Sequence, residues 1–202
     1  MDESLDSRLA GMAARLDRLR ELDPPKREAF SSMRTAGRRP GGYIMFGADR
    51  HGHRNQPLTE AQLGALEGAM GVALPGDFRA FLERIGTGAG PFYGIDRYQA
   101  LLRDATPECA RPFPTGERGP FFTGDDDDDG LEHGYLPIIE RGCGDEVGLV
   151  TAGPRRGHVV NIDMGDQWIL GPDFLTYYDT WLDRSIDQLS RTPRPTHVYW
   201  VL

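Results

Sequence analysis

The sequence contains only two cysteines, Cys109 and Cys143, among its 202 residues. Two thiols permit a single bridge but give no disulfide framework, and reduced thiols are the default inside a cell. No apolar run approaches the roughly 20 residues that a membrane-spanning helix needs. The first residues, Met1–Asp6, are acidic and lack the basic and apolar regions of a secretory signal. We therefore expect a reduced, cytoplasmic protein that makes no membrane contact.

Positive charge is scarce over most of the chain. Residues 1–57 carry 11 basic and 8 acidic side chains, whereas residues 58–202 carry 12 basic and 23 acidic ones, which gives the larger segment a net charge of −11. Nucleic-acid binding depends on Lys and Arg side chains that neutralise phosphates, so this balance argues against DNA or RNA as the partner. It favours a basic protein partner instead.

Two consecutive amphipathic helices are predicted at the start of the acidic segment. The first covers 58–72 and has Thr59 in position to cap it. Pro75 cannot continue that helix, and helical spacing of apolar residues resumes over 78–85. Gly86 is expected to end the second helix in a left-handed conformation. The apolar face of the first helix consists of Leu63, Leu66 and Met70.

Three strands and a closing helix are predicted further along. Residues 135–139 look like a strand of a known protein family, the stretch 142–150 like a turn followed by a second strand, and 158–163, after the turn Gly153–Gly157, like a third, so that together they form a meander. The last helix is expected to begin near Pro172 and to continue to Leu189. The chain resembles the SUKH superfamily in the order of these elements. They are the two helices, a glycine-rich corner over 86–94, the meander and the closing helix. The resemblance spans 57–189, about two thirds of the chain.

This resemblance implies a fold and a function. The fold would be α+β, with a curved, mostly antiparallel sheet and packed helices over 57–202, preceded by a helical extension and loop over 1–56. Most bacterial members of the superfamily are immunity proteins, so the function implied is the neutralisation of a secreted or contact-delivered toxin of a polymorphic toxin system. The protein would occlude the toxin's active site without catalysis and without a cofactor or metal. A regulatory or scaffolding module is the alternative that eukaryotic members suggest.

The N-terminal extension is predicted to contain a helix from Ser4 to Leu22, ended by Asp23-Pro24-Pro25. Its apolar residues form a narrow stripe over about 2.5 heptads, which is short for a coiled coil, so we expect the stripe to dock on the main domain. A second short helix is expected over 26–35, and an edge strand over 43–46. The stripe consists of Leu5, Leu9, Met12, Leu16 and Leu19.

A run of five aspartates interrupts the second half of the chain. It has three interpretations: a solvated loop, an acidic prong that enters a basic toxin cleft, or a calcium loop. Calcium is disfavoured because Leu136 stands where such a loop needs a bidentate glutamate. Together with neighbouring aromatic residues, the run supplies most of the expected contacts. The residues expected to contact the toxin are Asp125, Asp126, Asp127, Asp128, Asp129, Phe121, Phe122, Glu132, Tyr93 and the exposed edge near Trp168.

Four motifs suggest chemistry, and each has a simpler interpretation. Cys143 lies between two glycines and could act as a nucleophile with His133 or His158 as its base, but packing is the commoner role of such a cysteine. His51 and His53 have metal-binding spacing without a third ligand, which favours a solvated loop. The glycine-rich corner follows a helix instead of preceding one, which is the wrong order for a phosphate-binding loop. Paired carboxylates for acid–base work are available at Glu140, Asp145 and Glu146, which we interpret as surface charges.

Overall fold

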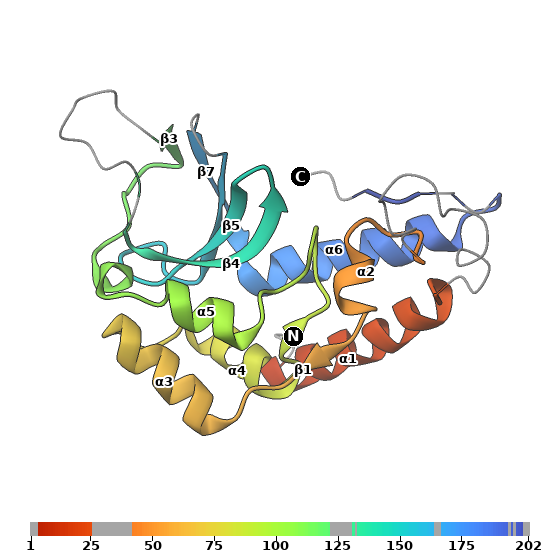
Figure 1. Cartoon of the computed structure of the whole chain (residues 1–202), viewed down its shortest axis with the longest axis horizontal. Helices are drawn as coiled ribbons and strands as arrows, with labels where there is room; N and C mark the ends of the chain where they lie inside the picture. Colours follow the sequence, from red (N-terminus) through yellow and green to blue (C-terminus); the bar gives the residue numbers. More distant parts are fainter. Residues whose placement is uncertain are drawn as a thin grey trace, which may run out of the picture.

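The computed structural model describes residues 4–25, 42–121, 131, 133–163, 167–193, 195 and 197–199. Figure 1 shows an antiparallel sheet at one end of the molecule, with helices packed below it and two long helices extending away from it. The α+β fold with an N-terminal helix is confirmed. In the described part of the chain, every helix is too short or too polar to cross a membrane.

The predicted helix pair is present as α3 (Glu60–Met70) and α4 (Gly76–Arg84). Thr59 caps α3 through a capping box, because its Oγ1 accepts the Gln62 N–H at 3.3 Å while Gln62 Oε1 accepts the Thr59 N–H at 2.9 Å. Gly86 follows α4 with a φ of +96°, as predicted. A Cβ at Gly86 would lie 2.0 Å from the Gln56 carbonyl oxygen, so only glycine fits this corner.

The five-stranded sheet is a continuous antiparallel arrangement in the order β3-β7-β6-β5-β4. The predicted meander corresponds to β4 (Tyr135–Gly142), β5 (Asp145–Val150) and β6 (His158–Ile162). The sequence pattern did not predict β7 (Gln167–Asp173) or the short strand β3 (Arg118–Pro120). It also missed a two-stranded ribbon, in which β1 (Asn55–Gln56) pairs antiparallel with β2 (Thr87–Gly88), and the helix α5 (Tyr98–Asp104).

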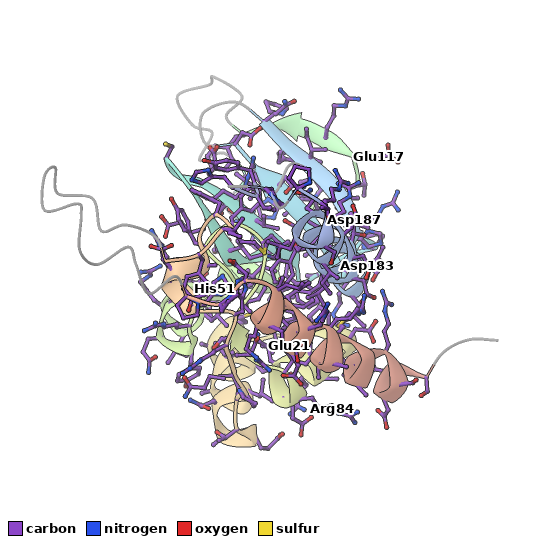
Figure 2. The ribbon with its side chains drawn as sticks, turned by 90° about the vertical axis from the view of Figure 1, so that its right-hand side faces the viewer. Glu21, His51, Arg84, Glu117, Asp183 and Asp187 are labelled. Carbon is purple, nitrogen blue, oxygen red and sulfur yellow. The ribbon has the colours of Figure 1, made fainter. Side chains whose placement is uncertain are left out.

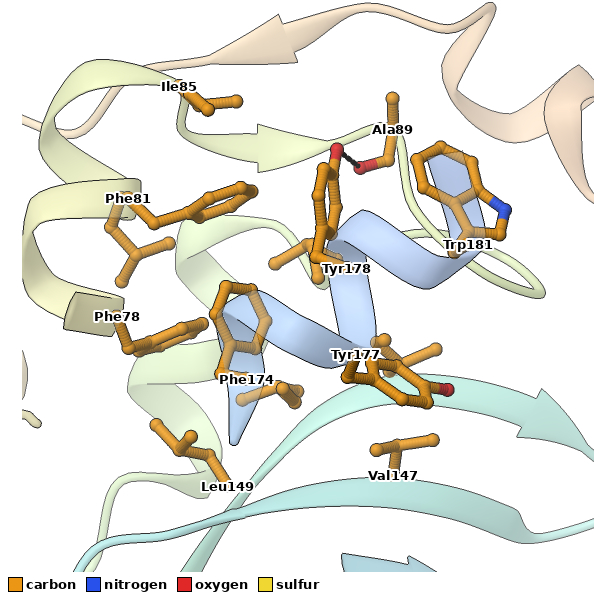
Figure 3. Packing of buried hydrophobic residues seen from close by; sticks show 14 of the residues in the cluster. Phe78, Phe81, Ile85, Ala89, Val147, Leu149, Phe174, Tyr177, Tyr178 and Trp181 are labelled. Atoms are coloured by element: carbon orange, nitrogen blue, oxygen red, sulfur yellow. Dashed lines mark hydrogen bonds between the residues drawn. The ribbon is translucent and has the colours of Figure 1, made fainter. Parts of the chain in front are cut away.

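Buried aromatic side chains pack together where α4 meets α6 (Phe174–Ser190). Phe81 lies edge-on to Phe174 and to Tyr178, with ring centroids 4.9 and 4.7 Å apart respectively (Figure 3). The Tyr178 hydroxyl donates to the Ala89 carbonyl oxygen at 2.7 Å. The closing helix therefore holds the glycine-rich corner in place as well as covering the sheet.

The N-terminal helix α1 (Leu5–Leu22) lies along α6. Ser4 caps it, and its stripe residues Leu9, Met12, Leu16 and Leu19 are buried in the same apolar cluster as the aromatic residues of α6. Arg8 and Arg15 both bind Asp179, and Arg15 also reaches Asp183 at 2.6 Å. Figure 2 shows α1 crossing the molecule below the labelled Asp183 and Asp187 of α6. Docking of the stripe within the same chain is confirmed.

The predicted edge strand at 43–46 is corrected to a single bridge. Met45 makes a parallel bridge with Val198, and the Phe46 N–H donates to the Val198 carbonyl at 2.9 Å. The chain then turns at Gly47, which has a φ of +78°, into the short helix α2 (Ala48–His51). Val198 lies in this bridge, whereas Trp200 and Leu202 are outside the described residues. The helix predicted over 26–35 is also outside them.

Candidate partner-binding site

The structure describes three of the residues expected to contact a partner. Phe121 and Trp168 are each only 5% exposed and belong to a core cluster that also contains Phe113. Their expected role as surface contacts is therefore corrected to packing. The exposed side chain at this edge is Ile169, at 42%, because successive residues of a strand point to opposite faces. Phe122, Glu132, Asp125, Asp126, Asp127, Asp128 and Asp129 lie outside the described residues.

Tyr93 lies at the surface within a group of aromatic side chains. The guanidinium of Arg50 stacks over its ring, 3.7 Å from the centroid, and the Phe46 ring lies 5.1 Å away. Phe46 is 39% exposed and in turn contacts Tyr199, which is 60% exposed. We call Phe46, Arg50, Tyr93 and Tyr199 the aromatic patch. Of these four residues, only Tyr93 was expected from the sequence to contact a partner.

Close backbone packing positions the aromatic patch. A Cβ at Gly47 would lie 1.8 Å from the Phe92 carbonyl oxygen, so α2 starts directly against the glycine-rich corner. Phe92 has a φ of +51°, and this left-handed turn precedes Tyr93. The bridge between Met45 and Val198 places Phe46 and Tyr199 next to each other. Three separate stretches of the chain thus contribute to one surface.

A pocket of about 500 Å³ lies beside the patch, between α2 and the start of α5. Tyr93 and Arg50 form part of its wall, together with Asp49, His51, Asp96 and Arg97. Burial raises the pKa of Asp96 to about 6. The nearby carboxylates of Asp104 and Glu140 raise this pKa further, whereas Arg103 and Arg50 lower it. Within the described residues, the Asp96 carboxylate has no hydrogen bond or ion pair. A carboxyl group with a raised pKa that lies in a pocket is a common feature of functional sites.

Beneath the pocket lies a buried polar network centred on Asp23. Its carboxylate accepts the backbone N–H groups of Ile44 at 2.7 Å and Met45 at 3.1 Å, and it lies 2.9 Å from His53 Nε2. Burial alone would raise the pKa of Asp23, but the hydrogen bonds from His53, Ile44 and Met45 outweigh it and lower that pKa. The network ties the end of α1 to the segment that carries Phe46.

The solvated loop expected around His51 and His53 is corrected by this network. His53 is completely buried, and its backbone N–H donates to His51 Nδ1 at 3.0 Å. Burial, with repulsion from His53, lowers the pKa of His51 to about 3, so His51 is neutral at pH 7. Among the described residues, no three His, Cys, Asp or Glu side chains are grouped to hold a metal ion.

The other residues that were considered for chemistry are exposed or take part in structural contacts. Cys143 is exposed in the β4–β5 turn, with a φ of +58°. His158 Nδ1 donates to the Gly171 carbonyl at 2.9 Å, so this nitrogen is not free to act as a base. Glu140 pairs with Arg50 at 2.6 Å, and Glu146 accepts from the Tyr135 hydroxyl at 3.1 Å. Glu140 thus belongs to a surface ion pair, and Glu146 to a hydrogen bond between neighbouring strands of the sheet.

Asp96→Asn is expected to stabilise the protein at neutral pH. The pKa of Asp96 rises from 3.8 to about 6 on folding, so above pH 6 the folded state contains a poorly solvated carboxylate. Removing this charge should raise the free energy of unfolding by about 1–2 kcal/mol at pH 7, and the gain should disappear near pH 4, where the carboxyl is protonated in the folded state. Urea titrations of both proteins at the two pH values measure the difference.

The matched control for this prediction is Asp49→Asn, which changes an exposed carboxylate on the rim of the same pocket. Its effect should stay within about 0.5 kcal/mol at both pH values. If the gain from Asp96→Asn is the same at pH 4 as at pH 7, the charge of Asp96 is not its cause.

Comparison with known proteins identifies the scaffold that carries this site. The family model described as SMI1 / KNR4 family (SUKH-1) matches residues 57–180, which is more than half of the chain. Domains of this family occur in immunity-type proteins, and their fold serves protein interaction. No curated protein and no solved structure matches the chain. The match includes the helix pair, the five strands of the sheet and the first part of α6, and the chain therefore belongs to the SMI1/KNR4 family (SUKH-1).

Proposed function

We propose that this protein is a cytoplasmic immunity protein that binds a cognate bacterial toxin through the aromatic patch and occludes the toxin's active site. The family supports a protein partner in general terms. The exposed residues of the aromatic patch support this part of the surface as the place where the partner binds. On this proposal the protein acts by binding and performs no catalysis.

The observation that carries the proposal is the exposure of two aromatic side chains next to a stacked arginine. Phe46 and Tyr199 are the two exposed large aromatic side chains of the described chain, and they lie 5.6 Å apart between ring centroids. Aromatic residues and arginine dominate the binding energy of protein interfaces, especially beside a pocket that a partner side chain can fill. The structure also holds these residues in place before binding, which reduces the entropy lost on association.

Charge indicates the nature of the partner. The protein has a formal net charge of −8, and residues 58–202 account for a net −11. Toxins that act on nucleic acids carry a basic active face, and an acidic protein would be drawn to such a face by long-range attraction. We further propose that Phe122, Glu132 and the aspartates at 125–129 add contacts to this basic surface. The extension over 1–56 belongs to the binding unit on this proposal, because Phe46 and Arg50 are part of it.

The test is a pull-down from the lysate and secreted fraction of the native host, with mass spectrometry of the retained proteins. The tagged protein is expected to retain one basic toxin. Replacing both Phe46 and Tyr199 by alanine should weaken that complex by at least about 30-fold, since interface hot spots contribute about 2 kcal/mol or more. Both side chains are exposed, so the double variant should keep its fold.

Ile169→Ala is the matched control, because Ile169 is an exposed apolar side chain on the sheet, away from the patch. It should retain the toxin as well as the unmodified protein does. Equal retention by the Phe46→Ala, Tyr199→Ala variant would show that the partner binds elsewhere. Retention of several housekeeping proteins in place of one toxin would favour a regulatory or scaffolding module.

A further inference from the structure

A second pocket, of about 370 Å³, has an unusual charge for this protein. It lies where α2, the β1–β2 ribbon and the start of α5 meet, and we call it the arginine notch. Among the described residues, its lining contains three arginines and no carboxylate, although acidic side chains outnumber basic ones by 31 to 23 over the chain. The residues that define the notch are Arg50, Arg54, Arg97, His51, Gln56 and Thr87.

Two of the three arginines have no carboxylate partner among the described residues. Arg50 already pairs with Glu140 and stacks on Tyr93. Within the described part of the chain, the side chains of Arg54 and Arg97 make no hydrogen bond and no ion pair, and both residues are exposed. In contrast, Arg8, Arg15, Arg79 and Arg141 are each bound to a carboxylate. The notch therefore combines two free guanidinium groups with a third that is partly neutralised.

His51 adds a neutral donor to the lining of the notch. Its Nδ1 accepts the His53 N–H, so the proton of the neutral ring is on Nε2. That Nε2 is buried and has no hydrogen-bond partner within the described residues. A buried donor without a partner is destabilising. Figure 2 labels His51, the last residue of α2.

We propose that the arginine notch binds an oxyanion, a carboxylate or phosphate group, held by Arg54 and Arg97. Guanidinium groups bind both kinds of oxyanion through paired, charge-assisted hydrogen bonds. The pocket volume is within the range of small-molecule sites, so the anion could be free or carried on a larger molecule. This inference rests on the charge and hydrogen bonding of the notch and does not depend on the proposed toxin binding.

The experiment titrates the full-length ¹⁵N-labelled protein with sodium phosphate and, separately, with sodium succinate as a carboxylate probe. Sodium chloride keeps the ionic strength constant. Saturable shifts are expected in the Arg54 and Arg97 side-chain signals and in the backbone signals of the notch. Replacing both arginines by alanine should weaken binding by about tenfold or more, because hydrogen bonds to charged groups contribute about 1.5–3 kcal/mol.

The Arg111→Ala, Arg118→Ala double variant provides the matched control, since both residues are exposed arginines outside the notch and their loss changes the net charge equally. It should bind both probes like the unmodified protein. Replacing Arg54 and Arg97 by lysine gives a second variant, which retains the charge but loses the planar fork and should also bind more weakly.

The two probes distinguish the source of the anion. Saturation by phosphate alone supports a site for phosphate groups, whereas saturation by succinate, alone or with phosphate, supports a site that also accepts an acidic side chain. The proposal is overturned if neither probe gives a saturable shift beyond that of chloride. It is also overturned if the alanine and lysine variants bind as tightly as the unmodified protein.

Discussion

Replacing Asp23 by alanine is expected to lower the free energy of unfolding by about 3–5 kcal/mol. The Asp23 carboxylate is almost completely buried and holds the N–H groups of Ile44 and Met45 and the ring of His53. Alanine would leave these donors buried without partners, which costs far more than the loss of an exposed pair. Urea titration at pH 7, compared at constant slope, measures the change.

Glu21→Ala is the control for this experiment, because Glu21 lies two residues earlier on α1 and its carboxylate is exposed and paired with Arg18. Its effect should remain below about 1 kcal/mol. The Asp23→Ala variant should also lose binding of the proposed partner, since Phe46 follows directly after the residues that Asp23 holds. A loss of stability no larger than that of Glu21→Ala would contradict the role assigned to the network.

Replacing Phe81 by alanine is expected to have an effect of similar size, about 3–5 kcal/mol. Phe81 is completely buried and contacts Phe174 and Tyr178 of α6 edge-on, as Figure 3 shows, while it stacks on Phe78 of its own helix. Truncation would leave a cavity between rigid aromatic rings that cannot close over it. The midpoint of urea unfolding is the appropriate measurement.

Phe46→Ala removes the same number of atoms from an exposed position and is therefore the control. Phe46 is in contact with Tyr93 and Tyr199 but outside the core, so its loss should change stability by no more than about 1 kcal/mol. The pair of variants separates packing from binding: Phe81→Ala acts on stability, and Phe46→Ala acts on the proposed interface. Similar unfolding midpoints for the two variants would contradict this division.

The elements that the sequence predicted well are those that local chemistry determines. Ser4 and Thr59 accept hydrogen bonds at the starts of α1 and α3, and Gly86 ends α4, all within a few residues of the positions that they control. The elements that were missed depend on distant partners. Gly119 of β3 faces the Trp168 indole, and a Cβ there would lie 2.7 Å from Trp168 Nε1, so this strand exists because glycine leaves room for the tryptophan.

The candidate site was predicted only at Tyr93, for a similar reason. The apolar run 43–46 has the composition of a strand, but Asp23 takes the N–H groups of Ile44 and Met45 that a neighbouring strand would need. The proximity of Phe46 and Tyr199 arises from a bridge between residues more than 150 positions apart. Spacing along the chain gives no signal for such a contact, and neither does composition.

The packing of α1 against α6 has a consequence for where this chain can be shortened. The match to the family ends at residue 180, whereas α6 continues to Ser190, and the part of that helix beyond residue 180 includes Asp183, which binds Arg15. A fragment limited to 57–180 would end within α6 and would lack α1, which packs along that helix. Its uncovered apolar surface would favour aggregation, so the two ends of the chain have to be kept together in any shortened form.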